Sequence, residues 1–301
     1  MGMGGGGSPE LYQYQPGDPR LPEGHRRSRI LGSAQAEGAR GVAIALVSTV
    51  VVLALIVWAV TSSPNWPEVK QAFFDPEEFK RVFPDIARAF LRNIQYFLIA
   101  EVFILAWALV LAVLRSLQGP VFFPLRALSI VYTDLFRGIP TVLVVYLLGF
   151  GIPSLGLPGV PSGAAFWGVV GLILSYSAYV AEVYRAGIES VHPSQAAAAR
   201  SLGLSRAKTL RFVIVPQAVR RVIPPLLNDF IGLQKDTALV AFVVAIPEAF
   251  KQGQIYQAAD FNFTPLLAVA LMFLLVTIPL TRFTDWLLER QRRRRQAGAV
   301  V

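Results

Sequence analysis

The most constraining feature of this chain is a stretch of 44 residues, from Gly138 to Ala181, without a single charged residue. It is too long for one membrane helix, which needs about 20 apolar residues. Residues 149–163 within it are rich in Gly and Pro, which end helices and form turns. The stretch therefore predicts two spans joined by a turn. The first span must begin near Leu125, because residues 139–148 alone are too short to cross.

The composition favours a lipid environment over water. Only 16% of the residues are charged and 54% are hydrophobic, whereas soluble domains carry about 25% charged residues. An isoelectric point near 10.1 could indicate nucleic-acid binding, but a basic nucleic-acid module is polar and this chain is not. The chain has no Cys and two His, so we expect no disulfide, no thiolate or histidine-rich metal site, and no bound metal.

Further apolar runs bring the predicted spans to six. The first run, Val42 to Val60, has 19 uncharged residues, which at about 1.5 Å per residue reach roughly 28 Å and cross the hydrocarbon core. The sequence thus predicts an all-α membrane protein with six transmembrane helices. The predicted spans are residues 42–60, 94–114, 125–148, 164–181, 222–247 and 264–281.

The remaining segments complete the predicted domain organisation. Residues 1–41, rich in Gly, are expected to form a disordered cytoplasmic tail because they cannot bury enough apolar surface. The segments are an extra first helix (42–60), an extracytoplasmic segment with short surface helices (61–91), a five-helix core (92–286) with a cytoplasmic loop (185–221), and a basic tail (287–301) that we expect to bind anionic lipid.

The distribution of basic residues predicts the orientation. Of the 28 Lys and Arg, 21 lie in the segments on the side of the N-terminus, six lie on the other side, and Lys235 lies within a span. Because cytoplasmic segments carry the excess of Lys and Arg, both termini are predicted to be cytoplasmic. The expected location is the cytoplasmic (inner) membrane, with multiple passes.

The loop of residues 185–221 has strong local signals. Ser194 to Ser201 is rich in alanine, which favours helix and permits close approach. Gly203 suits the left-handed position that ends a helix, and Ser205 suits the N-cap of a second one. We therefore predict two short helices joined by a glycine turn, with small side chains able to fit a groove in another protein.

These residues resemble the coupling loop, or EAA loop, of permease subunits of ATP-binding-cassette importers. The family pattern is Glu-Ala-Ala, three residues, Gly, nine residues, then Ile-x-Leu-Pro, and here Ala197-Ala198-Ala199, Gly203 and Val213 to Pro216 take these places. Over about residues 90–286 the chain is similar to the polar amino acid (histidine/glutamate/glutamine-type) family, and most similar to a glutamate permease subunit. The other motifs that carry this similarity are Phe136 to Pro140, Ala178 to Glu182 with Arg185 and Gly187, Pro216 to Ala218, and Pro225 to Asn228 with Lys235-Asp236-Thr237.

The resemblance implies a type I (MetI-like) permease fold and ATP-driven, binding-protein-dependent import of polar amino acids. Glutamate or another acidic amino acid is the first expectation, with glutamine, arginine, histidine and cystine as alternatives. An ATP-independent carrier or channel is a further alternative. The sequence has no P-loop motif, so the chain is not expected to be an enzyme or to bind a cofactor. ATP-Mg would bind a partner ATPase dimer, and the other implied partners are a second permease subunit, an extracytoplasmic substrate-binding protein and lipid, with no nucleic acid.

One departure from the family pattern concerns the partner subunit. Ala197 stands where the family has glutamate, which suggests a heterodimer whose other subunit carries the acidic loop. A homodimer that tolerates alanine is the alternative. The predicted ATPase-coupling residues are Ser194, Gln195, Ala196, Ala197, Ala198, Ala199, Leu202, Gly203, Ser205 and Pro216.

Charged residues within the spans are costly and usually face a cavity or a partner. Lys235 and Asp236 interrupt the fifth predicted span, and nearby Pro224 and Pro225 predict a discontinuous helix there. Lys235 could meet a substrate carboxylate and Asp236 an ammonium group, or the two could form a structural ion pair, either with each other or across subunits. The predicted substrate-pathway residues are Lys235, Asp236, Thr237, Arg137 and Glu182.

Two pairs at i, i+3 spacing are further candidates. Asp134 and Arg137 can pair on one helix face. In the family the Arg-Gly-x-Pro segment lies along the pathway, although a structural kink at Pro140 is an equally good reading here. Glu182 and Arg185 repeat the spacing at the membrane edge and could anchor the loop.

Overall fold

The computed structural model describes residues 38–117, 119–244, 246 and 248–297, and the regular structure in these residues is entirely helical. It forms two units, residues 1–66 and 67–301. The first contains helix α2 (Gly38–Thr61), which has no buried residue from Gly41 onward. Such a helix, apolar all round, suits a lipid environment. The predicted tail lies outside the described residues up to residue 37, and residues 38–41 already belong to α2.

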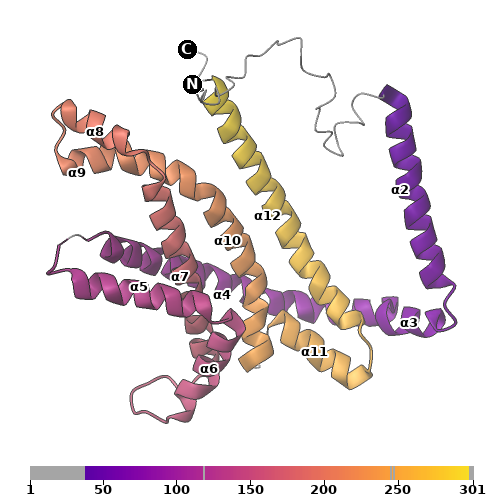
Figure 1. Ribbon diagram of the computed structural model, residues 1–301. Helices are drawn as coiled ribbons and strands as arrows, with labels where there is room; N and C mark the ends of the chain where they lie inside the picture. Colours follow the sequence, from indigo (N-terminus) through magenta and orange to yellow (C-terminus); the bar gives the residue numbers. More distant parts are fainter. Residues whose placement is uncertain (1–37, 118, 245, 247, 298–301) are drawn as a thin grey trace, which may run out of the picture. The chain divides into compact units, whose positions relative to one another are not determined.

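The second unit holds the other helices, labelled in Figure 1. A single turn of π-helix (Leu210–Ile214) leads into α10. The helices are α3 (Trp66–Phe73), α4 (Pro76–Ser116), α5 (Phe123–Gly138), α6 (Thr141–Ser154), α7 (Ala164–Glu189), α8 (Pro193–Ser201), α9 (Arg206–Thr209), α10 (Val215–Val244), α11 (Ala249–Asp260) and α12 (Thr264–Ala297).

Helix α4 is longer than the sequence predicted. We expected short helices up to residue 91 and a span from residue 94, but only α3 is separate and α4 runs unbroken from Pro76 to Ser116. Its start is well capped, because Asp75 accepts the backbone N–H groups of Glu77 and Glu78 at 2.9 and 3.2 Å. Pro76 stands at the start of the helix, where proline favours helix formation and does not interrupt it.

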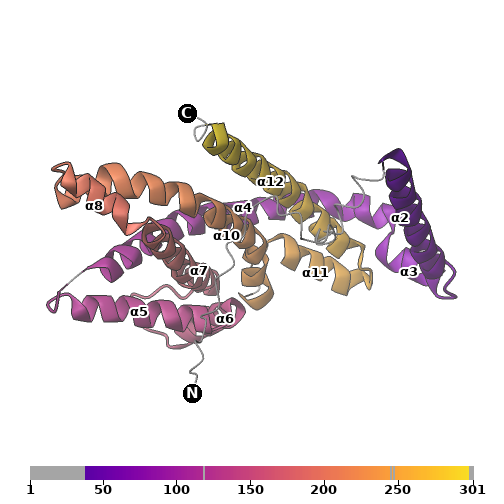
Figure 2. The ribbon, with the colours of Figure 1, turned by 45° about the horizontal axis from the view of Figure 1, so that its top comes forward.

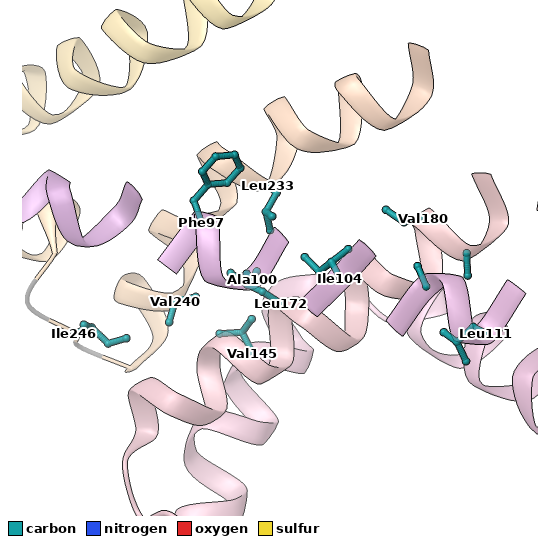
Figure 3. Packing of buried hydrophobic residues seen from close by; sticks show 12 residues of the cluster. Phe97, Ala100, Ile104, Leu111, Val145, Leu172, Val180, Leu233, Val240 and Ile246 are labelled. Carbon is teal, nitrogen blue, oxygen red and sulfur yellow. The ribbon is translucent and has the colours of Figure 1, made fainter. Parts of the chain in front are cut away.

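Two hydrophobic clusters lie along α4. The larger one joins the second half of α4 to α6, α7 and α10; in Figure 3 Phe97 lies beside Leu233, and Ala100 lies near Leu172 and Val145. The smaller one joins the first half of α4 to α11 and α12 around Val82, Ile86 and Val269. Helix α4 therefore links the two halves of this unit.

Helix α7 packs against α4, α5, α6 and α10, and glycines permit two of these contacts. A Cβ atom added at Gly171 would lie 3.0 Å from the Cα atom of Val145 in α6. A Cβ atom added at Gly187 would lie 2.0 Å from Cγ1 of Val222 in α10. Such close contacts through small residues are typical of helices that associate within membranes.

The described helices confirm a multi-span, all-helical protein but do not reach six spans by length and composition. Four are long and apolar enough to cross a membrane: α2, the Trp66–Ser116 stretch, α7 and the Thr264–Gln291 part of α12. A fifth is possible if α5 and α6 count as one span, yet they are bent by 102°. The predicted single helix over 125–148 is therefore wrong, and the alternative of a structural kink at Pro140 is confirmed, because Pro140 has no N–H group with which to continue α5.

Helix α10 would have to supply the sixth span. It is continuous over 30 residues with Pro224 and Pro225 inside it, so the predicted discontinuity is wrong. Prolines are tolerated in membrane helices where neighbouring groups satisfy the freed backbone. The irregular backbone lies earlier, in the π-helical turn. Helix α12 likewise continues to Ala297, beyond the predicted end of the last span at residue 281.

Candidate functional site

The predicted coupling loop forms an arm between α7 and α10, with α8 and α9 at its tip (Figures 1 and 2). Helix α8 is capped by His192, whose Nδ1 accepts the backbone N–H of Ser194 at 3.2 Å. Pro193 occupies the first helical position, where its missing N–H costs nothing. These residues confirm the helix that we predicted over 194–201.

The turn after α8 is the one that the glycine predicted. Gly203 has φ +82°, and its N–H donates to the carbonyl of Arg200 at 3.0 Å, while that of Leu204 donates to Ala199 at 3.2 Å. This pattern is a Schellman motif, which needs a left-handed residue. Ser205 then caps α9, its Oγ accepting the N–H of Lys208 at 3.4 Å. The predicted helix, turn and helix are confirmed.

The arm is fixed to the helices on both sides of it. Ala199 is only 5% exposed, so it holds α8 against the rest of the arm. The side chain of Gln217 in α10 donates to Gln195 of α8 at 3.5 Å, and Arg221 of α10 donates to the carbonyl of Ser190 at the end of α7. A force on α8 would therefore be transmitted to α7 and α10 together.

The outer surface of the arm carries mostly small side chains and is partly apolar. Leu202 at the turn is 84% exposed, and next to it small side chains leave the backbone accessible. This surface allows another protein to approach closely. Of the predicted coupling residues, Ala199 is buried, Ala196 is half-buried, Ser205 caps α9, and Ser194, Gln195, Ala197, Ala198, Gly203 and Pro216 are exposed.

At the base of the arm, one carboxylate meets three arginines, a group that we call the arginine junction (Glu182, Arg115, Arg137 and Arg185). Glu182 lies 3.2 Å from Arg115 of α4 and 3.9 Å from Arg137 of α5. It also pairs with Arg185 on its own helix, whose Nε donates at 3.1 Å. The junction therefore connects α4, α5 and α7 where the arm begins.

The junction revises the sequence-based pairs. The predicted pair of Glu182 and Arg185 is confirmed. The predicted partner of Arg137 is wrong: among the described residues Arg137 pairs with Glu182 of α7 and not with Asp134. We predicted no site role for Arg115 from the sequence. Its only sequence signal was that it lies, like Arg137 and Arg185, on the predicted cytoplasmic side of the membrane.

The polar residues 234–237 in the middle of α10 place their side chains on different sides of the helix. Lys235 is exposed and, within the described part of the chain, forms no ion pair. Asp236 accepts a hydrogen bond from the Tyr176 hydroxyl of α7 at 2.8 Å. Thr237 is fully buried and donates to the carbonyl of Gln234 at 2.8 Å. Lys235 and Asp236 therefore do not pair with each other here.

The buried members of this segment belong to a polar network inside the protein. Gln234 accepts from Thr277 of α12 at 2.9 Å. Asn93 of α4 lies 3.3 Å from the Thr237 hydroxyl and 2.6 Å from the carboxyl of Glu248, which is itself fully buried. Hydrogen bonds between buried polar groups fix the position of the helices that carry them. Lys235 is thus held outward on a rigid helix.

Comparison with known proteins gives a clear family match. Residues 116–293 match the family described as "Binding-protein-dependent transport system inner membrane component". This segment begins at the end of α4 and contains the arm and α10 through most of α12.

Individual relatives agree with this match. The chain is 35% identical over 197 residues to the probable amino-acid permease protein YxeN of Bacillus subtilis (strain 168), covering 65% of this chain and 86% of the relative. It is 35% identical over 196 residues to the probable glutamine ABC transporter permease protein GlnM of the same organism, covering 64% and 88%. A crystal structure of an amino acid ABC transporter with histidines is similar at TM-score 0.65 and 28% identity, covering 72% of this chain and 98% of that one.

Proposed function

The chain belongs to the family of binding-protein-dependent transport system inner membrane components, and we infer that it is the permease subunit of an ATP-driven amino-acid importer. Such a subunit forms the membrane pathway, and it is not itself an enzyme. The family and the apolar helices together place it in the inner membrane with several passes. The distribution of Lys and Arg supports cytoplasmic termini.

The observation that carries this function is the rigid arm of α8 and α9. The sequence has no P-loop, so energy from ATP must come from another protein. The arm offers that protein an exposed surface with Leu202 at its tip, and its hydrogen bonds to α7 and α10 join it to the membrane helices. Docking of an ATPase there would convert closure of the ATPase into movement of the helices as a rigid body.

Co-purification tests this proposal. We expect the wild-type chain, purified from its native membrane, to retain a P-loop ATPase, and Gly203→Val to lose it because valine resists the left-handed conformation. Gly156→Val is a matched control, since Gly156 also has a positive φ (+58°) but lies in the turn between α6 and α7. Equal retention of the ATPase by Gly203→Val would contradict the proposed docking site.

A second permease subunit would explain the exposed face of α10. Arg221, Asn228 and Lys235 are exposed, polar and seven residues apart, so they lie on one side of the helix. An unpaired lysine facing lipid would cost a few kcal/mol. We therefore place this face against a second permease subunit, where it lines the pathway. The junction residues Arg137 and Glu182 belong to the same proposed pathway, nearer the arm.

We also propose that the second subunit is a different chain, because Ala197 replaces the family glutamate on an exposed position of α8. The experiment uses two copies of the chain with different affinity tags expressed together. We expect purification through one tag to recover a distinct permease and not the second tagged copy. Recovery of the second copy would establish the homodimer instead.

Glutamate or another acidic amino acid is the first cargo to test. The resemblance to glutamate permeases supports it, and so does Lys235, because Asp236 is engaged by Tyr176 and does not neutralise the exposed ammonium. Uptake of labelled glutamate, glutamine, arginine and histidine should be compared between the wild type and a strain that lacks this chain. Loss of glutamate uptake alone supports this cargo, whereas selective loss of another amino acid assigns that one.

A further inference from the structure

An apolar groove lies away from the arm and the proposed pathway, between the start of α4 and the start of α12. Its volume is about 580 Å³, within the roughly 300–1,000 Å³ typical of small-molecule sites. Phe74 and Phe79 form one wall. The other wall is a single face of α12 with the i, i+3, i+4, i+7 spacing of a helix: Leu267, Ala270, Leu271 and Leu274.

The groove has a rigid rim. The rings of Phe73 and Phe263 stack with their centroids 4.7 Å apart. The backbone N–H of Phe263 donates to Ala72 at 2.6 Å, and that of Asp75 donates to the Thr264 hydroxyl at 3.1 Å. These contacts join the end of α3 to the first residue of α12, so the two walls are held apart at a fixed width.

The two ends of the groove differ in polarity. Lys80 lines the mouth and pairs with Glu77 at 3.0 Å, and both side chains are largely exposed. Asp75 also lines it, but its carboxylate is occupied by the N–H groups that it caps. From Thr264 the groove follows α12 to Leu274, a depth of about 15 Å at 1.5 Å per residue. Leu271 and Leu274 are 39% and 51% exposed in the apolar span, so this end opens to hydrocarbon.

We propose that the groove binds a membrane phospholipid, with one acyl chain along α12 and a zwitterionic headgroup at the mouth. The headgroup phosphate would meet Lys80 and the headgroup ammonium would meet Glu77, so each headgroup charge would face a side chain of opposite charge. Ala270 leaves the space that the acyl chain occupies. The proposal depends on α12 crossing the membrane, as its composition indicates, and not on the transport function.

The test uses the full-length chain in vesicles of phosphatidylglycerol that contain a trace of phosphatidylethanolamine with a photoreactive acyl chain. After irradiation, we expect labelled peptides from residues 264–274 and from residues 74–80. Excess unlabelled phosphatidylethanolamine should reduce this labelling at least fivefold, because a site saturates whereas a general lipid contact does not. The phosphatidylglycerol of the vesicle should compete less well, since it lacks the ammonium group.

Two variants locate the lipid. Ala270→Trp fills the groove and should reduce labelling at least fivefold, whereas Leu275→Trp, at an exposed residue outside the groove lining, should leave it unchanged. Glu77→Gln removes the ammonium partner without filling the groove, and should abolish the preference for phosphatidylethanolamine over phosphatidylglycerol even if Ala270→Trp does not fold. Labelling that neither saturates nor responds to Glu77→Gln would overturn the proposal, as would photo-crosslinking of these residues to another protein.

Discussion

The contact between Gly187 and Val222 leaves no space for a Cβ atom at residue 187, and Gly187→Ala tests it. The added Cβ would lie 2.0 Å from Cγ1 of Val222, whereas carbon atoms prefer about 3.5–4.0 Å. Val222 is 7% exposed, and its β-branched side chain has one favoured rotamer in a helix. Helices α7 and α10 must therefore separate. We expect a loss of about 1–3 kcal/mol in the free energy of unfolding, the usual cost of overpacking.

The assay is SDS-induced unfolding of the purified chain in mixed micelles, applied to a double-mutant cycle. Val222→Ala removes the atom that clashes, so the double variant Gly187→Ala/Val222→Ala should be more stable than the sum of the single changes predicts. The coupling free energy should be about 1–2 kcal/mol, within the 0.5–3 kcal/mol of contacting residues. Additive effects would refute the assignment of the clash to this pair.

Gly171 supplies a contrasting control for the same reasoning. Its added Cβ would meet the Cα and backbone N atoms of Val145 at 3.0 and 3.2 Å, and backbone atoms are not removed by trimming a side chain. Gly171→Ala should therefore destabilise the protein without rescue by Val145→Ala. Rescue as complete as that expected at Val222 would show that the helices adjust freely, contrary to the packing described.

Three further substitutions have distinct expected results. Glu182→Gln should lower the free energy of unfolding by about 1–2 kcal/mol, since three arginines, two of them partly buried, lose their anion, whereas Glu189→Gln, 61% exposed at its side chain, should cost less than about 0.5 kcal/mol. Glu248→Gln should cost about 1–3 kcal/mol in the same unfolding assay, because Asn93 and the backbone N–H of Lys251 donate to different carboxyl oxygens, and in glutamine one of these positions becomes an NH2 group that cannot accept. Lys235→Ala should leave stability unchanged yet reduce uptake of labelled substrate at least tenfold; a loss of stability with normal uptake would contradict the proposed position of Lys235.

The local structure of the arm could be predicted because short-range physics determines it. A left-handed turn requires a residue such as Gly203, and a free N–H group favours a serine cap such as Ser205. Both signals lie within a few residues of the structure that they specify. The membrane helices α2, α7 and α12 were recognisable for a similar reason, since a long apolar run has few alternatives to a helix in lipid.

The positions of the breaks could not be predicted in the same way. Prolines predicted a break in α10, interruptions before residue 94 and a kink at Pro140, yet of these only the kink at Pro140, between α5 and α6, is a sharp bend. A proline removes one hydrogen bond in every case, but whether the chain bends depends on the neighbours that satisfy the freed group. Those neighbours come from other helices and are not visible in the local sequence.

The arginine junction shows the same limit for side chains. The i, i+3 rule correctly paired Glu182 with Arg185, but it also suggested Asp134 for Arg137, which pairs with Glu182 of another helix. A spacing rule covers only pairs within one helix. The distribution of residues 234–237 to different sides of α10 likewise depends on how α10 packs against α4, α7 and α12.

Reconstituted transport gives the most direct test of the proposed function. The chain would be purified with its associated subunits and placed in sealed vesicles, with a substrate-binding protein outside and labelled amino acid as cargo. We predict uptake only when ATP-Mg is present on the side of the arm, and loss of uptake with Gly203→Val but not with Gly156→Val. Uptake without ATP, driven by an ion gradient alone, would contradict ATP-driven import through this chain.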